Sequence, residues 1–165
     1  MLTPVKKRGR SARGAAFAIV ASRYNARYAD GMLAAAVREL RRARAGRIEV
    51  VRVPGAYEIP VVAARLLRGG AGFAGVICLG VIIRGETAHA GQIGSAVSAS
   101  LARLQIEHGV PVIHEVLLLE NEAQARARCL GGTHNRGAEA ARTALEMARV
   151  MASLERKMRG AWRGI

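Results

Sequence analysis

Four short, almost continuously apolar segments, separated by stretches with helical spacing of apolar residues, constrain the fold of this chain more than any other feature. The apolar segments lie at residues 16–20, 48–53, 74–83 and 112–119. Helices are predicted at residues 30–43, with Asp30 as the cap, and at residues 58–67, 87–107, 120–129 and 135–159. Strands that are apolar on both faces and alternate with helices are typical of a parallel sheet covered on both sides. Because crossovers between such strands are right-handed, the pattern predicts an α/β fold, a three-layer αβα sandwich with a four-stranded parallel sheet.

Length and composition indicate one globular domain. The chain has 165 residues, of which 51% are hydrophobic, and this argues against intrinsic disorder. We expect a basic tail over residues 1–14, one α/β domain over residues 15–159 and a short tail over residues 160–165. No segment has the run of about 20 apolar residues that crosses a bilayer. A basic stretch before residues 15–21 faintly imitates a signal peptide, but the apolar run is at the minimum length for one. We therefore expect a buried first strand and a cytoplasmic protein.

The net charge of +14 is concentrated in three places: the N-terminal tail, residues 38–47 and the C-terminal end. Such a charge attracts phosphate polymers. No ladder of aromatic residues accompanies it, and no zinc-finger or RNA-binding signature is present. Solvated surface charge is therefore the preferred interpretation, with nucleic-acid binding as the alternative. Two cysteines, Cys78 and Cys129, exclude a disulfide-dense secreted scaffold, and the histidine spacing predicts no metal site.

Ligands of such sheets bind beyond the carboxyl ends of the strands, which directs attention to the loops at residues 22–25, 54–58 and 84–89. The third loop is the richest in chemistry. Gly85 permits close backbone approach, and the helix that follows offers free N–H groups to a phosphate. Thr87 can cap this helix or bind an anion, and His89 lies in its first turn as a candidate base. The alternative is an ordinary capped helix with a surface histidine.

A second cluster lies between residues 128 and 139. Arg128 ends one helix, Asn135 opens the next, and Arg136 and Glu139 share a helix face on which they can pair. The alternative is a plain connection with an exposed ion pair. His114, inside an otherwise apolar strand, is expected to be packed rather than catalytic, and Cys78 to be buried and inert.

Taken together, these motifs resemble the lumazine synthase family. The specific stretches are Pro-Gly-Ala-Tyr-Glu-Ile-Pro at residues 54–60 and Arg-Gly-Glu-Thr-Ala-His at residues 84–89. Ser-Arg-Tyr-Asn at residues 22–25, Gly-Val-Pro-Val-Ile at 109–113 and Asn-Arg-Gly-Ala-Glu at 135–139 accompany them. The resemblance covers roughly residues 15 to 155 and implies a flavodoxin-like sheet.

The resemblance implies an enzyme, a transferase of riboflavin biosynthesis. It would condense 5-amino-6-ribitylaminouracil with 3,4-dihydroxy-2-butanone 4-phosphate to give 6,7-dimethyl-8-ribityllumazine, phosphate and water, without cofactor or metal. His89 would be the general acid/base, and Tyr24 would stack on the pyrimidine. The other substrate-binding residues implied are Ala56, Tyr57 and Glu58 for the pyrimidine and its ribityl chain, Gly80, Val81 and Ile82 for the ring pocket, Gly85, Glu86, Thr87 and Arg128 for the phosphate, and His114 and Arg136.

The sequence departs from the family pattern beside these residues. Ala90, Gly91 and Gln92 stand where the family usually has Phe-Asp-x, His114 where a phenylalanine is common, Leu118 where a threonine is usual, and Arg136 where a lysine is usual. These departures keep open an alternative, a catalytically weak or inactive shell or scaffold protein of the same fold that binds nucleic acid through its basic surface.

The resemblance also implies a homo-oligomer, a ring of five subunits with an active site at each boundary. Tyr24, Glu58 and His89 would come from one subunit, and His114 and Arg128 from the next. The apolar faces of residues 87–107 and 135–149 exceed what one sheet needs to cover, which favours an interface. Both a pentamer and a closed icosahedral shell of pentamers are compatible with the sequence, and riboflavin synthase is a further candidate partner.

Overall fold

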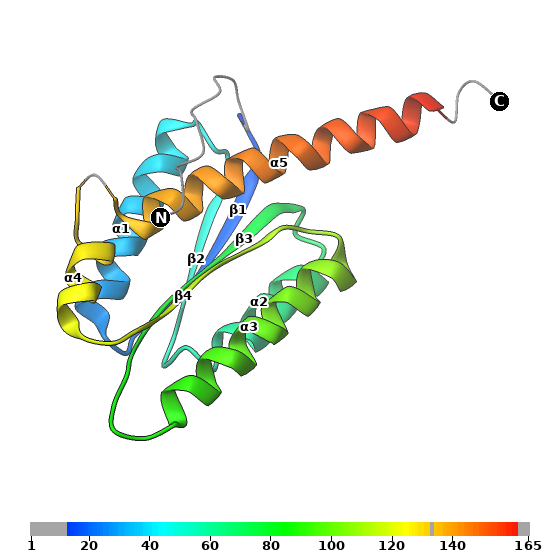
Figure 1. Ribbon diagram of the computed structural model, residues 1–165. Helices are drawn as coiled ribbons and strands as arrows, with labels where there is room; N and C mark the ends of the chain where they lie inside the picture. The colour runs from blue at the N-terminus through cyan, green and yellow to red at the C-terminus, as the bar shows by residue number, and fades with distance from the viewer. Residues whose placement is uncertain (1–12, 133, 162–165) are drawn as a thin grey trace.

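The computed structural model describes residues 13–132 and 134–161 and shows an all-parallel α/β domain (Figure 1). Most of the expected basic tail therefore lies outside the described residues, as does the C-terminal tail after residue 161. The elements in order are β1 (Ala16–Ser22), α1 (Ala26–Arg42), β2 (Ile48–Val53), α2 (Ile59–Arg68), β3 (Phe73–Ile83), α3 (His89–His108), β4 (Val112–Leu119), α4 (Glu122–Cys129) and α5 (Arg136–Ala161).

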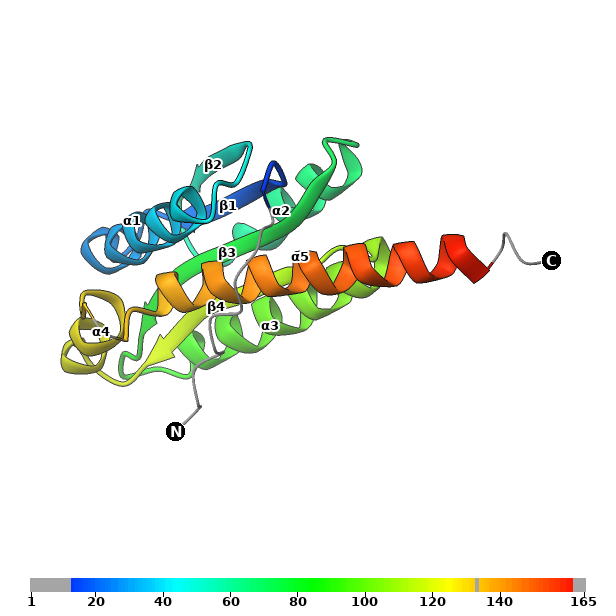
Figure 2. The ribbon, with the colours of Figure 1, turned by 90° about the horizontal axis from the view of Figure 1, so that it is seen from above.

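The sheet has the strand order β2-β1-β3-β4, and every neighbouring pair is parallel. Helices α1, α4 and α5 cover one face, and α2 and α3 cover the other (Figures 1 and 2). The predicted three-layer sandwich with a flavodoxin-like sheet is confirmed. Strand β1 shows why the sheet is covered on both faces, because Phe17 and Ile19 pack toward α1 and α5 while Ala18 and Val20 pack toward α2 and α3. A central strand of this kind has no polar face, which is why the sequence shows a continuous apolar run.

The first helix starts earlier than the sequence pattern predicts, and the proposed cap was wrong. Helix α1 begins at Ala26, so Asp30 lies inside it and its carboxylate pairs with Arg52 of β2. The residue before the helix is Asn25, whose φ of 54° is left-handed. Its side chain does not cap the helix but donates a 2.8 Å hydrogen bond to the Val81 carbonyl at the end of β3. A left-handed conformation suits asparagine better than most side chains.

Helix α3 begins at His89 rather than at residue 87, and Thr87 does not cap it. Ala88 occupies the cap position, without a side-chain hydrogen bond. Residues 84–88 of the preceding loop are exposed, and the loop is tied to the end of β4 by a 2.8 Å hydrogen bond from the Arg84 N–H to the Leu119 carbonyl.

The ionisable core groups fit the sequence expectation. Cys78 and Cys129 are free and buried, and burial raises the pKa of both thiols, to about 11 for Cys129. Thiols of this kind are unreactive at neutral pH, so the prediction for Cys78 is confirmed. Across residues 13–132 and 134–161, no helix is long and apolar enough to span a membrane.

Arg136 is committed to two carboxylates inside the domain. Its guanidinium lies 2.6 Å from a carboxylate oxygen of Glu115 on β4 and 2.6 Å from one of Glu139 on α5. The predicted Arg136–Glu139 pair is confirmed. The Glu115 side chain is only 7% exposed, and burial raises the pKa of its carboxyl, while the charge and hydrogen bond of Arg136 oppose that rise.

Replacing Arg136 by alanine should destabilise the fold in a pH-dependent way. The change leaves Glu115 buried without its cation, which costs about 3 kcal/mol of unfolding free energy near pH 8. The folded-state pKa of Glu115 then rises further above its unfolded value. The variant loses stability as pH rises through that folded pKa, because Glu115 then becomes charged without a partner. Its deficit relative to the parent protein should therefore shrink near pH 5. Urea unfolding of R136A and the parent protein at the two pH values, at equal protein concentration, measures the difference in unfolding free energy.

Arg103→Ala serves as the control, because the Arg103–Glu107 pair lies on the surface of α3. Exposed pairs contribute little to stability, and this variant should unfold like the parent at both pH values. A deficit in R136A that did not change between pH 5 and pH 8 would contradict the assignment to Glu115.

Candidate active site

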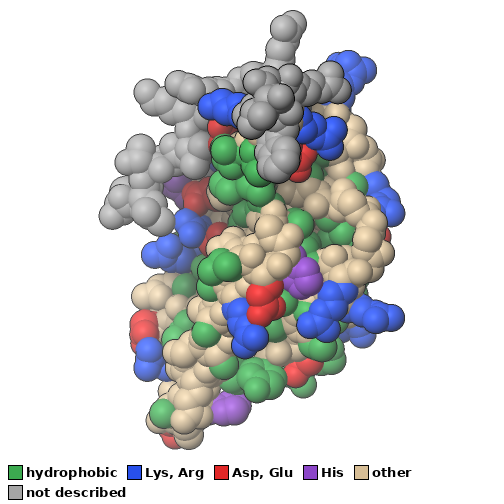
Figure 3. Space-filling view, turned by 90° about the vertical axis from the view of Figure 1, so that its right-hand side faces the viewer, with side chains coloured by type: hydrophobic (Ala, Val, Ile, Leu, Met, Phe, Trp, Pro, Cys, Tyr) green, Lys and Arg blue, Asp and Glu red, His purple; other side chains and the backbone are tan. Residues whose placement is uncertain are grey.

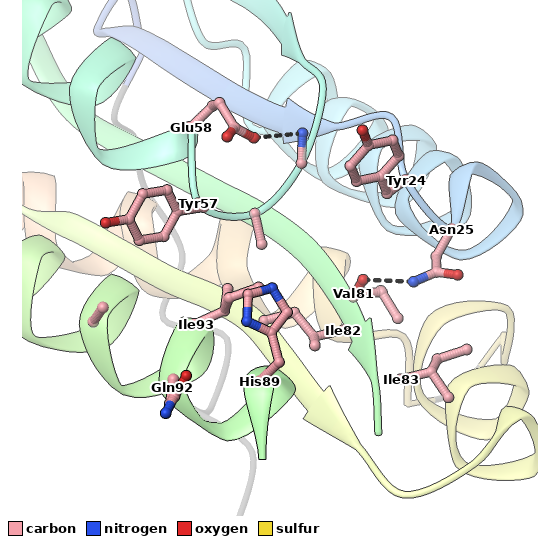
Figure 4. Close-up of a pocket in the computed structure, with 13 residues that line it drawn as sticks. Tyr24, Asn25, Tyr57, Glu58, Val81, Ile82, Ile83, His89, Gln92 and Ile93 are labelled. Carbon is pink, nitrogen blue, oxygen red and sulfur yellow. Dashed lines mark hydrogen bonds between the residues drawn. The ribbon is translucent and has the colours of Figure 1, made fainter. Parts of the chain in front are cut away.

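A cavity of about 640 Å³ opens at the carboxyl ends of β1, β2 and β3, against the first turns of α3 (Figure 4). The three loops selected from the sequence meet here, as expected for a parallel sheet. The lining residues are Tyr24, Asn25, Gly55, Ala56, Tyr57, Glu58, Val81, Ile82, Ile83, His89, Gln92, Ile93 and Ala96.

The loop after β1 presents an aromatic ring to the cavity. Tyr24 is 68% exposed although its ring packs over the loop after β2. A Cβ on Gly55 would lie 2.9 Å from Cδ2 of Tyr24, so only glycine lets the two loops approach this closely. The Tyr24 N–H donates a 2.9 Å hydrogen bond to the Pro54 carbonyl, which joins the two loops at the cavity mouth.

Glu58 places a carboxylate at the start of α2. One of its oxygens accepts a 2.8 Å hydrogen bond from the Gly55 N–H and closes the turn. Its other oxygen has no hydrogen-bond partner among the described residues, and it is the natural acceptor for a ligand hydroxyl.

One face of α3 forms the opposite wall. His89 is the first helical residue, and its exposed imidazole projects into the cavity beside Ile82 and Ile93 (Figure 4). Within the described part of the chain its ring makes no hydrogen bond, so both nitrogens are available to a ligand. Gln92, Ile93 and Ala96 follow His89 at helical spacing. The sequence analysis named Gln92 only as a departure from the family pattern and did not name Ala96, although the 3.6-residue period starting from His89 points to the same face.

The cavity unites seven of the residues implied by the resemblance: Tyr24, Ala56, Tyr57, Glu58, Val81, Ile82 and His89. Asn25, Gly55 and Ile83 also line it and were not named as site residues, although Asn25 and Gly55 belong to the selected loops. Gly80 lies beneath the cavity, because a Cβ there would meet Ile59 and Val116 at 3.2 Å. Gly85, Glu86 and Thr87 form the exposed loop that leads to His89 but do not line the cavity.

Three implied residues lie away from this cavity. Arg128 is exposed at the end of α4, and Arg136 is held by Glu115 and Glu139. His114 lies on edge strand β4, where its Nε2 is 2.7 Å from the Ser98 hydroxyl and its Nδ1 accepts a 3.2 Å hydrogen bond from the Val116 N–H.

The environment of His114 fixes its tautomer. A backbone N–H can only donate, so Nδ1 must be the acceptor and Nε2 carries the proton toward Ser98. The Ser98 hydroxyl in turn donates to the Gly94 carbonyl at 2.8 Å. Desolvation of the ring lowers the pKa of this histidine, and an interaction with its own backbone partly opposes that shift. Both ring nitrogens of His114 thus have partners, but the residue is exposed and not packed as the sequence predicted. The Ser98 proton is directed away from the ring.

The chemistry of the cavity is that of a site for a small organic molecule with polar substituents. It combines an exposed aromatic ring, a free carboxylate oxygen, an unpartnered imidazole and apolar side chains from β3. No cluster of three or more metal-ligating side chains occurs in the part of the chain that the structure describes.

Comparison with known proteins connects this arrangement to a single family. The family described as 6,7-dimethyl-8-ribityllumazine synthase matches residues 14–152. A protein of that name from Stenotrophomonas maltophilia (strain R551-3) is 41% identical over 151 residues, covering 88% of this chain and 94% of its own length. Its counterpart from Xanthomonas campestris pv. campestris (strain B100) is 42% identical over 83% of this chain and 90% of its own length. Another, from Kineococcus radiotolerans, is 44% identical over 81% of this chain and 83% of its own length. The chain, with its cavity at the carboxyl ends of a flavodoxin-like sheet, therefore belongs to the 6,7-dimethyl-8-ribityllumazine synthase family, an enzyme family of riboflavin biosynthesis.

Proposed function

We propose that the chain condenses 5-amino-6-ribitylaminouracil with 3,4-dihydroxy-2-butanone 4-phosphate to form 6,7-dimethyl-8-ribityllumazine, with release of phosphate and water. The observation that carries this proposal is the meeting of Tyr24, Glu58 and His89 in one cavity. Their side chains supply a ring to stack on a pyrimidine, an acceptor for a polyhydroxylated chain and a proton-transfer group. This combination matches the chemistry of the two substrates.

In this proposal the pyrimidine lies against the Tyr24 ring and the backbone of residues 81–83, with its ribityl chain near Ala56 and the free oxygen of Glu58. The 5-amino group attacks the ketone of the second substrate, and an imine forms with loss of water. His89 moves the protons of imine formation and of phosphate departure, which it can do because neither ring nitrogen is engaged. No cofactor is required for these steps.

The phosphate would lie near Gly85, Glu86 and Thr87, at the N-terminus of α3. Free backbone N–H groups and the helix dipole favour an anion there. Arg128 would add a bidentate charged contact. Since Arg128 does not line the cavity of its own chain, we infer that it reaches the cavity of a neighbouring subunit, together with His114.

We further propose that five copies form a ring. Helix α3 has no charged face along most of its length, and large apolar side chains are exposed on the α2–α3 layer, with Val61 at 68% and Ile106 at 80%. Exposed apolar surface of this kind favours association. A ring would bring the β4 side of one subunit, with His114, toward the next. The same rings could also assemble into a closed icosahedral shell. The proposal includes a cytoplasmic location and riboflavin synthase as a candidate partner.

Mixing the purified protein with the two substrates tests the reaction. We expect the absorbance of the lumazine to grow at a rate proportional to enzyme concentration, because all groups needed for proton transfer and ring binding are present in one cavity. Absence of product at high enzyme concentration, in a protein that retains its α/β fold by circular dichroism, would instead favour the inactive scaffold protein. That result would be traced first to the residues that depart from the family pattern, Ala90, Gln92 and His114 among them.

A further inference from the structure

Basic segments that are far apart in the sequence gather at one end of the domain, opposite the cavity. Helices that connect parallel strands run antiparallel to them, so α1 and α2 end where the strands begin. We call this region the basic end. Its exposed basic residues are Arg38, Arg41, Arg44, Arg47, Arg65, Arg68, Arg156, Lys157 and Arg159.

Helix α5 extends the basic end beyond the sheet. The α5 helix runs alongside α1, as the Arg142–Glu39 ion pair shows. Helix α1 stops at Arg42 while α5 continues to Ala161, so residues 149–161 project by about 20 Å. Figures 1 and 2 show this projection, and Figure 3 views the domain from that side, with Lys and Arg side chains spread over the face.

Both ends of the domain contain paired and unpaired arginines. Ion pairs form at the cavity end, at Arg52, Arg84 and Arg126, and toward the basic end, at Arg42, Arg103 and Arg149. At the basic end, Arg38, Arg41, Arg65 and Arg68 have no ion-pair partner within residues 13–132 and 134–161. Uncompensated, exposed guanidinium groups on one end create a positive potential that draws in polyanions.

We propose that the basic end binds nucleic acid through its phosphate backbone, without recognising bases. This goes beyond the proposed enzymatic function and does not depend on it. Arginine dominates the set, and its planar guanidinium binds phosphate in a bidentate manner. Large apolar side chains are exposed on α5, at Val150, Leu154 and Met158, but not between residues 38 and 47 or between residues 65 and 70. The α1 and α2 part of the basic end therefore offers charge alone, whereas binding to a lipid surface also buries apolar residues. Among the described residues, no aromatic ring is exposed at the basic end, so no described side chain there offers a platform for stacking on bases.

The structure strengthens the case for nucleic-acid binding over solvated surface charge. Along the chain, residues 38–47 and the C-terminal helix are separate charged stretches, and each by itself is typical of a solvated surface. The fold places them at the same end, together with Arg65 and Arg68, which the sequence analysis did not count. Counterion release grows with the number of phosphates contacted at once, and it is this joint placement that makes the surface a binding site.

Fluorescence anisotropy of a labelled DNA duplex of about 30 base pairs, titrated with the full chain at salt between about 50 and 200 mM, tests the proposal. We expect binding whose affinity falls steeply with salt and does not depend on base sequence. The double variant R38Q/R41Q should bind about tenfold or more weakly near 0.1 M salt and lower the salt slope by about 2, since two phosphate contacts are lost.

The matched control is R23Q/R27Q, which removes two exposed arginines at the cavity end and gives the same net charge. It should bind DNA like the parent protein. Equal weakening by both double variants would mean that net charge alone draws the duplex, and would overturn the proposal. Absence of DNA binding at the lowest salt, or binding to vesicles that contain anionic phospholipid but not to DNA, would also overturn it. Enzymatic activity is not part of the readout, so the proposed reaction can fail or succeed separately.

Discussion

Replacing His89 by alanine should lower the rate of lumazine formation by about 10²- to 10⁴-fold, the usual contribution of a positioned general acid/base. The loss should fall on kcat more than on KM, because the imidazole acts on protons in transit rather than on bound groups. His89 is exposed and makes no hydrogen bond within the described residues, so the fold should persist. Steady-state absorbance assays of H89A and the parent protein give the rate, and circular dichroism confirms the fold.

His108→Ala is the matched control, since His108 is the last residue of the same helix, at its opposite end. H108A should retain the parental rate. A loss of rate of less than about threefold in H89A would contradict the role of His89 as general acid/base.

Co-expression of H89A with R128A tests the proposal that neighbouring subunits share the site. In a mixed ring of the proposed kind, some boundaries would receive an intact His89 from one subunit and an intact Arg128 from the next. Activity of the mixed assembly above that of either single variant is therefore expected. Rings without such recovery would place both residues in the cavity of one chain, contrary to the positions of α4 and α3 in the structure.

Replacing Gly137 by alanine should destabilise the domain by about 3 kcal/mol or more, the upper range for an overpacked interior. Gly137 lies in the first turn of α5, where an added Cβ would collide with the carbonyl group of Met32 in α1. Backbone cannot yield as a flexible side chain does. Asn135 prevents α5 from moving away, because it donates to the Cys129 carbonyl and accepts a 2.9 Å hydrogen bond from the Gly137 N–H. Urea unfolding at matched protein concentration measures the loss, since the stability of an assembly of the proposed kind would depend on concentration.

Gly91→Ala is the control for this change. Gly91 is also helical, in α3, and a Cβ there meets no atom within 4 Å. G91A should be neutral or more stable by about 0.5–1 kcal/mol, because alanine favours the helix. If G137A were as stable as G91A, the close approach of α1 and α5 would not limit packing in this fold.

The sequence by itself determined the fold class. Residues 74–83 are apolar on both faces, and only a strand covered by two layers of helices buries such a run. The loops at residues 22–25, 54–58 and 84–89 follow three of these strands, so their convergence at one edge was predictable without coordinates. Helix starts were harder to predict. The asparagine at residue 25 takes a left-handed conformation and bonds to Val81, a partner 56 positions away, and no local pattern contains that information.

Only the tertiary structure decided which candidate residues share the cavity. Nothing in the sequence distinguishes the glycine at position 80 from its neighbours, yet packing against Ile59 and Val116 places it beneath the cavity floor. Arg136 looked like an exposed half of an ion pair, and the sheet brings buried Glu115 within 2.6 Å of it. The basic end arises for the same physical reason. Antiparallel placement of helices against parallel strands brings the ends of α1, α2 and α5 together, and charges separated along the chain then share one surface.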